Sequence, residues 1–278
     1  MPSFDRRSFY AELAPRDRHA RLVDHLFILR DCGQLIGTGT NLFSSPFVEI
    51  ALVGRLGDAD GGRERTPRAW TLACRTPSFG RQPRRRGFHG WMLGFRVPPF
   101  TLAIDQEELA PMSRPFVANI DDTVAVDALA YRLDDWIDAV WASLAAASRA
   151  NPASCGSPTS VAALAADAGV APRTLQRRFR ARTGLAPKRL FALQRFDRAL
   201  KAIASGGDNL ADIAVDAGYC DQAHLTADLT RHAGLPPGRF RALARQQCAP
   251  DPVRFFKDTK LRERARLVIG NCAEEAQA

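Results

Sequence analysis

The stretch RTLQRRFRARTG at residues 173–184 concentrates positive charge around a small apolar stripe. Successive residues of an α-helix advance by about 100°, so Leu175 and Phe179 would share one face of a helix that Pro172 opens and Gly184 ends. The long polar side chains would lie opposite or beside that face: Arg173, Gln176, Arg177, Arg178, Arg180 and Arg182. Five arginines without an acidic residue favour an anionic partner over a solvated surface helix, which usually mixes both signs.

The arginine-rich stretch belongs to a sequence repeat. VAALAADAG at 161–169 matches LADIAVDAG at 210–218, with apolar residues at the first and fourth positions and Asp-Ala-Gly at the end. Beyond the glycine the offset is 50 residues, so Leu175 aligns with Leu225 and Phe179 with Leu229. A repeat of this kind indicates one supersecondary unit used twice.

Each copy predicts a helix, a tight turn at its glycine and a second helix, which is the pattern of a helix-turn-helix unit. The expected N-caps are Thr159 or Ser160, Asp208 or Asn209, and, for the second helix of the second copy, Asp221. A helix over 187–203 would join the units through an apolar face. Because the second helix of such a unit enters the major groove, two rigidly joined units could read neighbouring groove segments, about 34 Å apart.

Charge and composition agree with a DNA partner. Of the net charge of +9, most lies in residues 131–278, which carry 22 Lys+Arg against 15 Asp+Glu, whereas residues 1–130 carry 17 against 15. The six cysteines are scattered without a C-x-x-C pair, which favours reduced thiols over disulfides or a zinc site. The sequence shows neither a signal peptide nor a membrane-length apolar run, so a cytoplasmic location is expected.

Three segments resemble the DNA-binding domain of the AraC/XylS family of bacterial transcription regulators. They are LAADAGVAPRTLQRRFRARTGLAPKRL (164–190), LQRFDRAL (193–200) and IAVDAGYCDQAHLTADLTRHAGLPPGRFR (213–241). The resemblance implies a homeodomain-like double helix-turn-helix domain whose two second helices face the major groove.

By position, the resemblance also implies roles for individual residues. Four side chains of the second reading helix and three of the first would face base edges: Arg173, Gln176, Arg177, Gln222, Ala223, His224 and Thr226. The implied phosphate contacts are Arg180, Lys188 and Arg189.

The sequence departs from the family pattern at several places. Ala171 stands where a serine cap is usual, and Leu229 replaces a usual phenylalanine. The second reading helix has one arginine, Arg231, against Asp221 and Asp228. The second unit is therefore expected either to contact DNA weakly or to serve mainly to stabilise the domain.

Residues 1–125 have a β-rich pattern, with short apolar runs at 25–31, 47–54, 70–76 and 90–97. They resemble the small N-terminal domains of some AraC-type regulators, many of them cupin-like barrels, which bind an effector, form dimers or both. His19, His25 and His89 stand alone in the sequence and are interpreted as core or surface residues. No cofactor-binding, metal-binding or catalytic motif is recognised, so the chain is predicted not to be an enzyme.

The predicted fold class is α+β with two domains, a small β-rich domain followed by an all-α one. The first domain would span 1–125 and the DNA-binding domain 126–246, with units at about 160–184 and 209–234. In the helical pattern that begins at Val126, the early part would be an interdomain or dimer helix, and the later part would form the first helix of the DNA-binding domain. The tail, 247–278, would either dock back on the protein or remain free.

The leading hypothesis is a sequence-specific transcription regulator that binds a double-stranded DNA operator. The expected further partners are a small-molecule effector in the N-terminal domain, a second copy of the chain and RNA polymerase, and no membrane. One alternative is a ligand sensor with weak DNA binding. Another is an enzyme or repair factor targeted to DNA, which would need a reactive or zinc-bound cysteine cluster that the sequence does not display.

Overall fold

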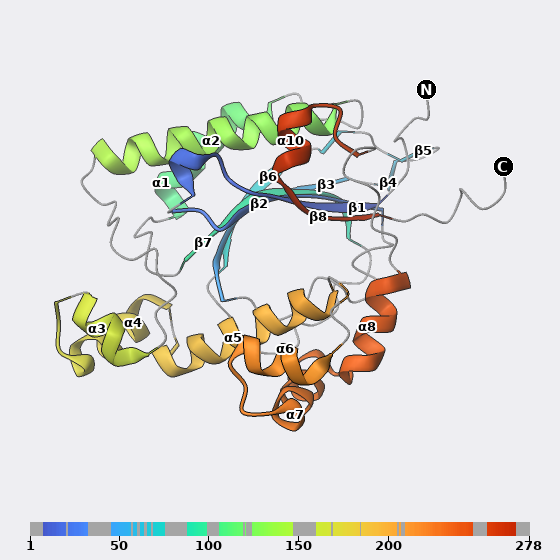
Figure 1. Ribbon diagram of the computed structural model, residues 1–278. Helices are drawn as coiled ribbons and strands as arrows, with labels where there is room; N and C mark the ends of the chain where they lie inside the picture. The colour runs from blue at the N-terminus through green and yellow to red at the C-terminus, as the bar shows by residue number, and fades with distance from the viewer. Residues whose placement is uncertain are drawn as a thin grey trace.

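The computed structural model describes residues 8–32, 46–75, 88–98, 106–146, 160–246 and 255–270, apart from residues 21, 57, 60–61, 64–65, 68, 119, 121–123, 168, 184, 205 and 207–208. Within these residues the chain forms an antiparallel sheet with helices on both faces (Figure 1).

The sheet has six strands in the order β6-β3-β7-β2-β1-β8, and every neighbouring pair is antiparallel. The strands are β1 (Phe9–Leu13), β2 (His25–Cys32), β3 (Val48–Arg55), β6 (Trp70–Arg75), β7 (His89–Val97) and β8 (Ala265–Gly270). A separate hairpin joins β4 (Asp58–Ala59) to β5 (Gly62–Arg63). Strands β2, β3, β6 and β7 confirm the four apolar runs, whereas the sequence did not reveal β1 or β8.

The main core lies between the sheet and helices α1 (Gln106–Val117) and α2 (Val126–Ala146). Trp136 of α2 is at its centre, with its ring 5.1 Å from Phe95 of β7 and 5.4 Å from Phe116 of α1, measured between centroids. The apolar face of α2 therefore packs on the sheet and not on the helical domain. The boundary predicted after residue 125 instead assigned α2 to the DNA-binding domain. The periodicity of α2 shows which of its residues are buried, but it does not show which element they pack against.

The C-terminal segment returns to the sheet and completes it. Strand β8 pairs with β1 from Phe9↔Gly270 to Leu13↔Ala265, and Phe256 and Leu261 are buried in the main core. The short helix α10 (Thr259–Arg264) precedes β8 directly. The tail thus docks back on the protein, and the helices between α2 and α10 form an insertion in the chain of the sheet domain.

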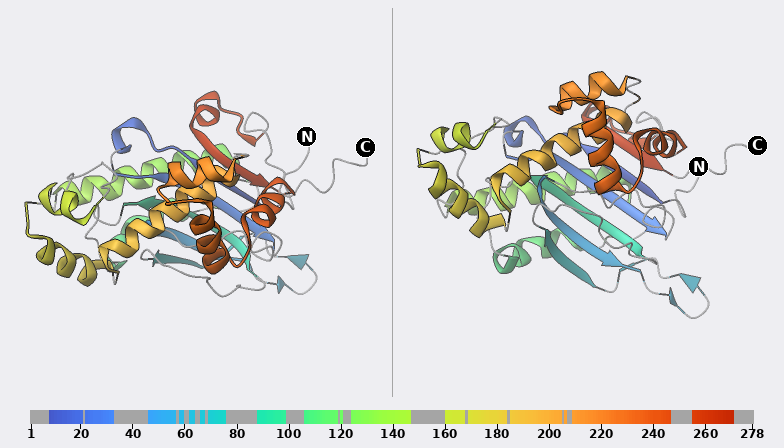
Figure 2. Two further views of the ribbon diagram at one scale, coloured as in Figure 1. Left: turned by 60° about the horizontal axis from the view of Figure 1, so that its bottom comes forward. Right: turned by 90° about the horizontal axis from the view of Figure 1, so that it is seen from below.

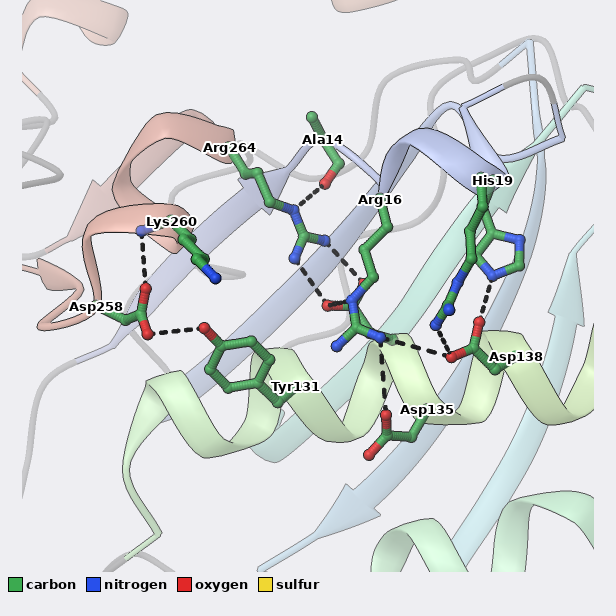
Figure 3. Close-up of polar contacts among 11 residues, drawn as sticks. Ala14, Arg16, His19, Tyr131, Asp135, Asp138, Asp258, Lys260 and Arg264 are labelled. Atoms are coloured by element: carbon green, nitrogen blue, oxygen red, sulfur yellow. Dashed lines mark hydrogen bonds and ion pairs between the residues drawn. The ribbon is translucent and has the colours of Figure 1, made fainter.

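Polar contacts fix this segment to α2 (Figure 3). The Arg264 guanidinium donates two hydrogen bonds to the Asp134 carboxylate, at 2.7 and 2.8 Å, and a third to the carbonyl of Ala14 at 2.9 Å. The Tyr131 hydroxyl donates to Asp258, the N-cap of α10, at 2.8 Å. Since Asp134 is almost fully buried, removing Arg264 would leave a buried carboxylate with fewer partners.

The remaining helices are α3 (Val161–Asp167), α4 (Pro172–Thr183), α5 (Pro187–Ala204), α6 (Leu210–Ala217), α7 (Gln222–Ala233) and α8 (Pro237–Gln246). Helix α5 lies on the face of the sheet opposite α2, as the views in Figure 1 and Figure 2 agree. The described strands form an open sheet, not the barrel that many domains of the resembled family have.

Two histidines of the sheet domain, His19 and His25, make contacts with carboxylates. His25 is fully buried, with its Nδ1 atom 2.6 Å from the Asp24 carboxylate, and His19 of the short 3₁₀ helix Asp17–His19 contacts Asp138. Among the described residues, no three His, Cys, Asp or Glu side chains come together as a metal site. None of the described helices combines the length and apolar character that crossing a membrane requires.

Candidate nucleic-acid interface

The first reading helix, α4, is attached to the domain by the predicted apolar stripe. Leu175 and Phe179 are 6% and 2% exposed. The described polar side chains of the opposite surface are all exposed: Arg173, Gln176, Arg177, Arg178 and Arg180. Pro172 is the first helical residue, as predicted. Gly184, predicted as the C-cap, lies outside the described residues.

The turn before α4 follows the sequence prediction. Gly169 has φ +62°, in the left-handed region that favours glycine. The Ser160 hydroxyl accepts a hydrogen bond from the Ala163 amide at 3.1 Å and so caps α3. Among the side chains that the structure describes, the buried cluster of this unit consists of Ala165 and Leu175, with Val161 and Val170 packed partly against them. Ala171 has no side-chain acceptor, so this residue cannot cap α4 through its side chain.

Helix α5 joins the units through a continuous buried face. Its buried residues are Pro187, Leu190, Leu193, Phe196, Ala199, Leu200 and Ile203. Phe196, Leu200 and Ile203 belong to the core of the second unit, so that unit is built directly on the connecting helix. Lys188 and Arg189 are exposed in the first turn of α5, where the helix N-terminus adds to their attraction for phosphate.

The second unit is capped at each helix start. The Asn209 side chain accepts from the Ala211 amide at 2.9 Å, and the Asp221 carboxylate accepts from the His224 amide at 2.7 Å. Gly218 ends α6 in the left-handed region with φ +92°. Eleven buried residues from α5, α6, α7 and the turn between α6 and α7 form its core, including Leu225 and Leu229 at no measurable exposure.

The predicted base-reading residues of α7 lie on its outer surface. Gln222, Ala223 and His224 are exposed, and Thr226 is half-buried. An open hollow of about 780 Å³ lies over this surface. Its described lining consists entirely of α7 residues: Gln222, Ala223, Thr226, Ala227, Thr230 and Arg231.

A buried aromatic contact behind α7 was missed in the sequence. The Tyr219 ring packs edge-on against the His224 ring, with 5.1 Å between the ring centroids. The Arg195 guanidinium of α5 lies 5.6 Å from the centroid of the Tyr219 ring. Burial, together with the charge of Asp228, raises the pKa of the Tyr219 hydroxyl. Tyr219 follows the turn glycine directly, and this position beside the start of α7 is the signal that could have identified it.

Comparison with known proteins identifies the helical region. Residues 164–243 match the family model described as "Helix-turn-helix domain". An AraC-like transcription regulator of Streptomyces lividans is 36% identical over 81 residues, which cover 29% of this chain and 27% of the relative.

Two solved structures are similar to about a third of the chain. A transcriptional regulator of Chromobacterium violaceum with an AraC-type DNA-binding domain is 27% identical, with a TM-score of 0.30, and the match covers 32% of this chain and 80% of that one. The DNA-binding domain of AdpA, solved with a target DNA, is 30% identical, with a TM-score of 0.29 and coverage of 32% and 79%. On the family model and the curated relative, residues 164–243 belong to the AraC type of helix-turn-helix domain.

Proposed function

We propose that this protein is a sequence-specific transcription regulator that binds duplex DNA through α4 and α7 and is modulated through its sheet domain. The observation that carries the proposal is the exposed arginine surface of α4, at the second-helix position of a helix-turn-helix unit. The side chains on this surface lie where such a unit meets the major groove. The second unit, on the same connecting helix, offers a second contact on one duplex.

The residues of the first unit divide into two roles. Arg173, Gln176 and Arg177 are the proposed base-reading residues, since arginine pairs with guanine and glutamine with adenine through two hydrogen bonds each. Arg180, Lys188 and Arg189 are the proposed phosphate contacts, which fix register and carry no sequence information. Gln222, Ala223, His224 and Thr226 are the proposed base-reading residues of the second unit.

Modulation through the sheet domain is supported by the contacts of α5. The Lys201 ammonium lies 5.5 Å from the ring centroid of Phe47, which precedes β3, and pairs with Asp197 at 3.0 Å. The charges of Asp197, Asp24 and Glu12 together raise the pKa of Lys201 against the opposing effect of burial. The helix that connects the two reading units thus touches the sheet domain, and an effector or a second copy bound there could act through it.

The test is selection of genomic fragments by the full-length protein, followed by titration of a selected fragment and a scrambled duplex. Arg177→Ala should cost about 1–3 kcal/mol on the selected duplex and relax the preference at one base pair. Arg114→Ala is the matched control, because Arg114 is an exposed arginine of α1, outside both units, and its replacement removes the same charge. Equal binding to selected and scrambled duplexes would refute the proposal.

A further inference from the structure

The exposed face of α7 differs from that of α4 at each equivalent position. With the offset of 50 residues, Arg173, Gln176, Arg177 and Arg180 of α4 correspond to Ala223, Thr226, Ala227 and Thr230 of α7. At these four positions, each long hydrogen-bond donor of the first reading helix is therefore replaced by a side chain no larger than threonine. These four small residues, spaced i, i+3, i+4 and i+7, form one face of α7, which we call the methyl face.

The threonines of the methyl face turn their hydroxyls towards the helix. The Thr226 hydroxyl donates to the carbonyl of Gln222 at 2.8 Å, and the Thr230 hydroxyl donates to the carbonyl of Thr226 at 2.8 Å. A hydroxyl that is bonded to its own helix backbone is a poor candidate for reading a base. What these residues offer to a partner is mainly the methyl group, beside the methyl groups of the two alanines.

The charges near the methyl face are engaged elsewhere or lie at its end. Asp221 caps the helix through the His224 amide, and Asp228 lies 3.8 Å from His232 on the inner side. Gln222 stands at the N-terminal end of the hollow and Arg231 at its C-terminal end. Between them the surface is uncharged, apolar and open, and the small side chains allow the helix backbone to approach the floor of a groove closely.

We propose that the methyl face reads the 5-methyl groups of thymine, so that the DNA segment bound by α7 is rich in A·T pairs. Among base edges in the major groove, only thymine displays a methyl group, and alanine and threonine methyls are its usual apolar contacts. Gln222 would add two hydrogen bonds to a neighbouring adenine. This inference rests on the proposed function, and it assigns the two units different base classes: guanine-containing pairs for α4 and thymine-containing pairs for α7.

The first arm of the test locates the DNA segment that α7 binds. Duplexes selected from a random library by the full-length protein should contain two preferred segments about one helical turn apart. Arg177→Ala should relax the preference in one segment and Gln222→Ala in the other, and the second segment should be rich in A·T pairs. A segment rich in G·C pairs, or no response to Gln222→Ala, would overturn the inference.

The second arm removes only the methyl groups. Replacing thymine by deoxyuridine in the α7 segment should weaken binding about fourfold for each contacted methyl, the equivalent of about 0.8 kcal/mol for burying one such group. The same replacement in the α4 segment is the control and should have little effect. Specific binding that ignores deoxyuridine in the α7 segment would overturn the inference and leave the proposed function standing, whereas absence of any sequence preference would overturn both.

Protein variants supply the matching half of the experiment. Thr226→Ser removes the methyl group and keeps the hydroxyl, so this variant should lose the discrimination between thymine and deoxyuridine at the base pair that Thr226 contacts. Thr226→Val keeps a methyl group on the outer surface and should retain the discrimination. If Thr226→Ser discriminates as the unchanged protein does, the assignment of a thymine contact to Thr226 is overturned, and the methyl groups of Ala223 and Ala227 are left as the ones that contact thymine.

Discussion

Among the described residues, the first helix-turn-helix unit has more exposed positive charge and a smaller buried cluster, whereas the second has a larger buried core and less charge. The described part of helix α4 displays five exposed polar side chains, four of them arginines, above the buried Leu175 and Phe179, and the described buried cluster of this unit joins Leu175 to Ala165. Helix α7 displays a mostly uncharged face above a core of eleven buried residues. The duplication therefore preserved the backbone arrangement while the two reading surfaces diverged.

The difference suggests a division of work between the units. Attraction between arginines and phosphates needs little preorganisation, because it is long-ranged and tolerant of geometry. Contacts between methyl groups need close approach and a fixed backbone, since dispersion falls off within a fraction of an ångström. The better packed unit is accordingly the one whose proposed contacts are close and apolar, whereas the phosphate contacts proposed for Arg180, Lys188 and Arg189 in the other unit tolerate more movement of the helix.

The largest expected contrast concerns packing, and Leu225→Ala and Leu175→Ala test it at equivalent positions. Leu225 has no exposure and lies in the larger core, so its truncation should destabilise the second unit by about 4–5 kcal/mol. Leu175 is 6% exposed beside a small cluster, so its truncation should cost the first unit about 2–3 kcal/mol. Hydrogen exchange measured by mass spectrometry reports the two units separately. Equal losses would show that the clusters support their units equally.

The two turn glycines provide the next contrast. At Gly218, with φ +92°, a β-carbon would also lie 3.2 Å from the Arg195 stem, so Gly218→Val should cost about 2–3 kcal/mol. At Gly169, with φ +62°, a β-carbon would meet nothing within 4 Å, and Gly169→Val should cost only backbone strain, about 1–2 kcal/mol. Urea unfolding followed by circular dichroism would compare them. A larger loss at Gly169 would mean that the first turn has a tighter role than its open surroundings indicate.

Salt dependence separates the two reading faces electrostatically. Arg180→Ala should weaken binding to all duplexes and reduce the slope of log affinity against log salt by up to about 0.9, the contribution of one neutralised phosphate. Thr230→Ala, at the equivalent position of α7, should leave the slope unchanged. Titrations of selected and scrambled DNA at several salt concentrations provide the measurement. If Thr230→Ala changed the slope as much, the charge asymmetry would have no bearing on phosphate contacts.

The features that were predicted from the sequence depend on neighbouring residues, and those that were missed depend on residues far apart in the chain. Caps, turns and apolar stripes are local, so Asp221, Gly169, Gly218 and the buried face of α5 were readable from neighbouring residues. The elements that pack against β1 and α2 could not be predicted in this way. For β1, the partner strand β8 lies some 250 residues away in the sequence, as the pair Phe9↔Gly270 shows. A strand of five or six residues carries too short a pattern to indicate such a distant partner.

The candidate site shows a similar limit. Position in the repeat predicted which side chains of α4 and α7 would be exposed, since a helix fixes its faces by period alone. It did not predict that the Thr226 and Thr230 hydroxyls bond back to the helix, because threonine can adopt more than one rotamer there. The hollow over α7 and the Tyr219 contact behind it likewise depend on tertiary packing.

The smallest expected contrast is in the caps that open the two reading helices. Ala171 offers no side-chain acceptor to α4, whereas Asp221 accepts from the His224 amide of α7 at 2.7 Å. Ala171→Ser should therefore add a cap and stabilise the first unit by about 0.5–1 kcal/mol, and Asp221→Ala should remove one and destabilise the second by about 1 kcal/mol. Thermal melts and hydrogen exchange at the first turn of each helix would measure both changes. If Ala171→Ser gave no gain, the amides that open α4 would already be satisfied by solvent, and the looser packing of the first unit would lie in its small core alone.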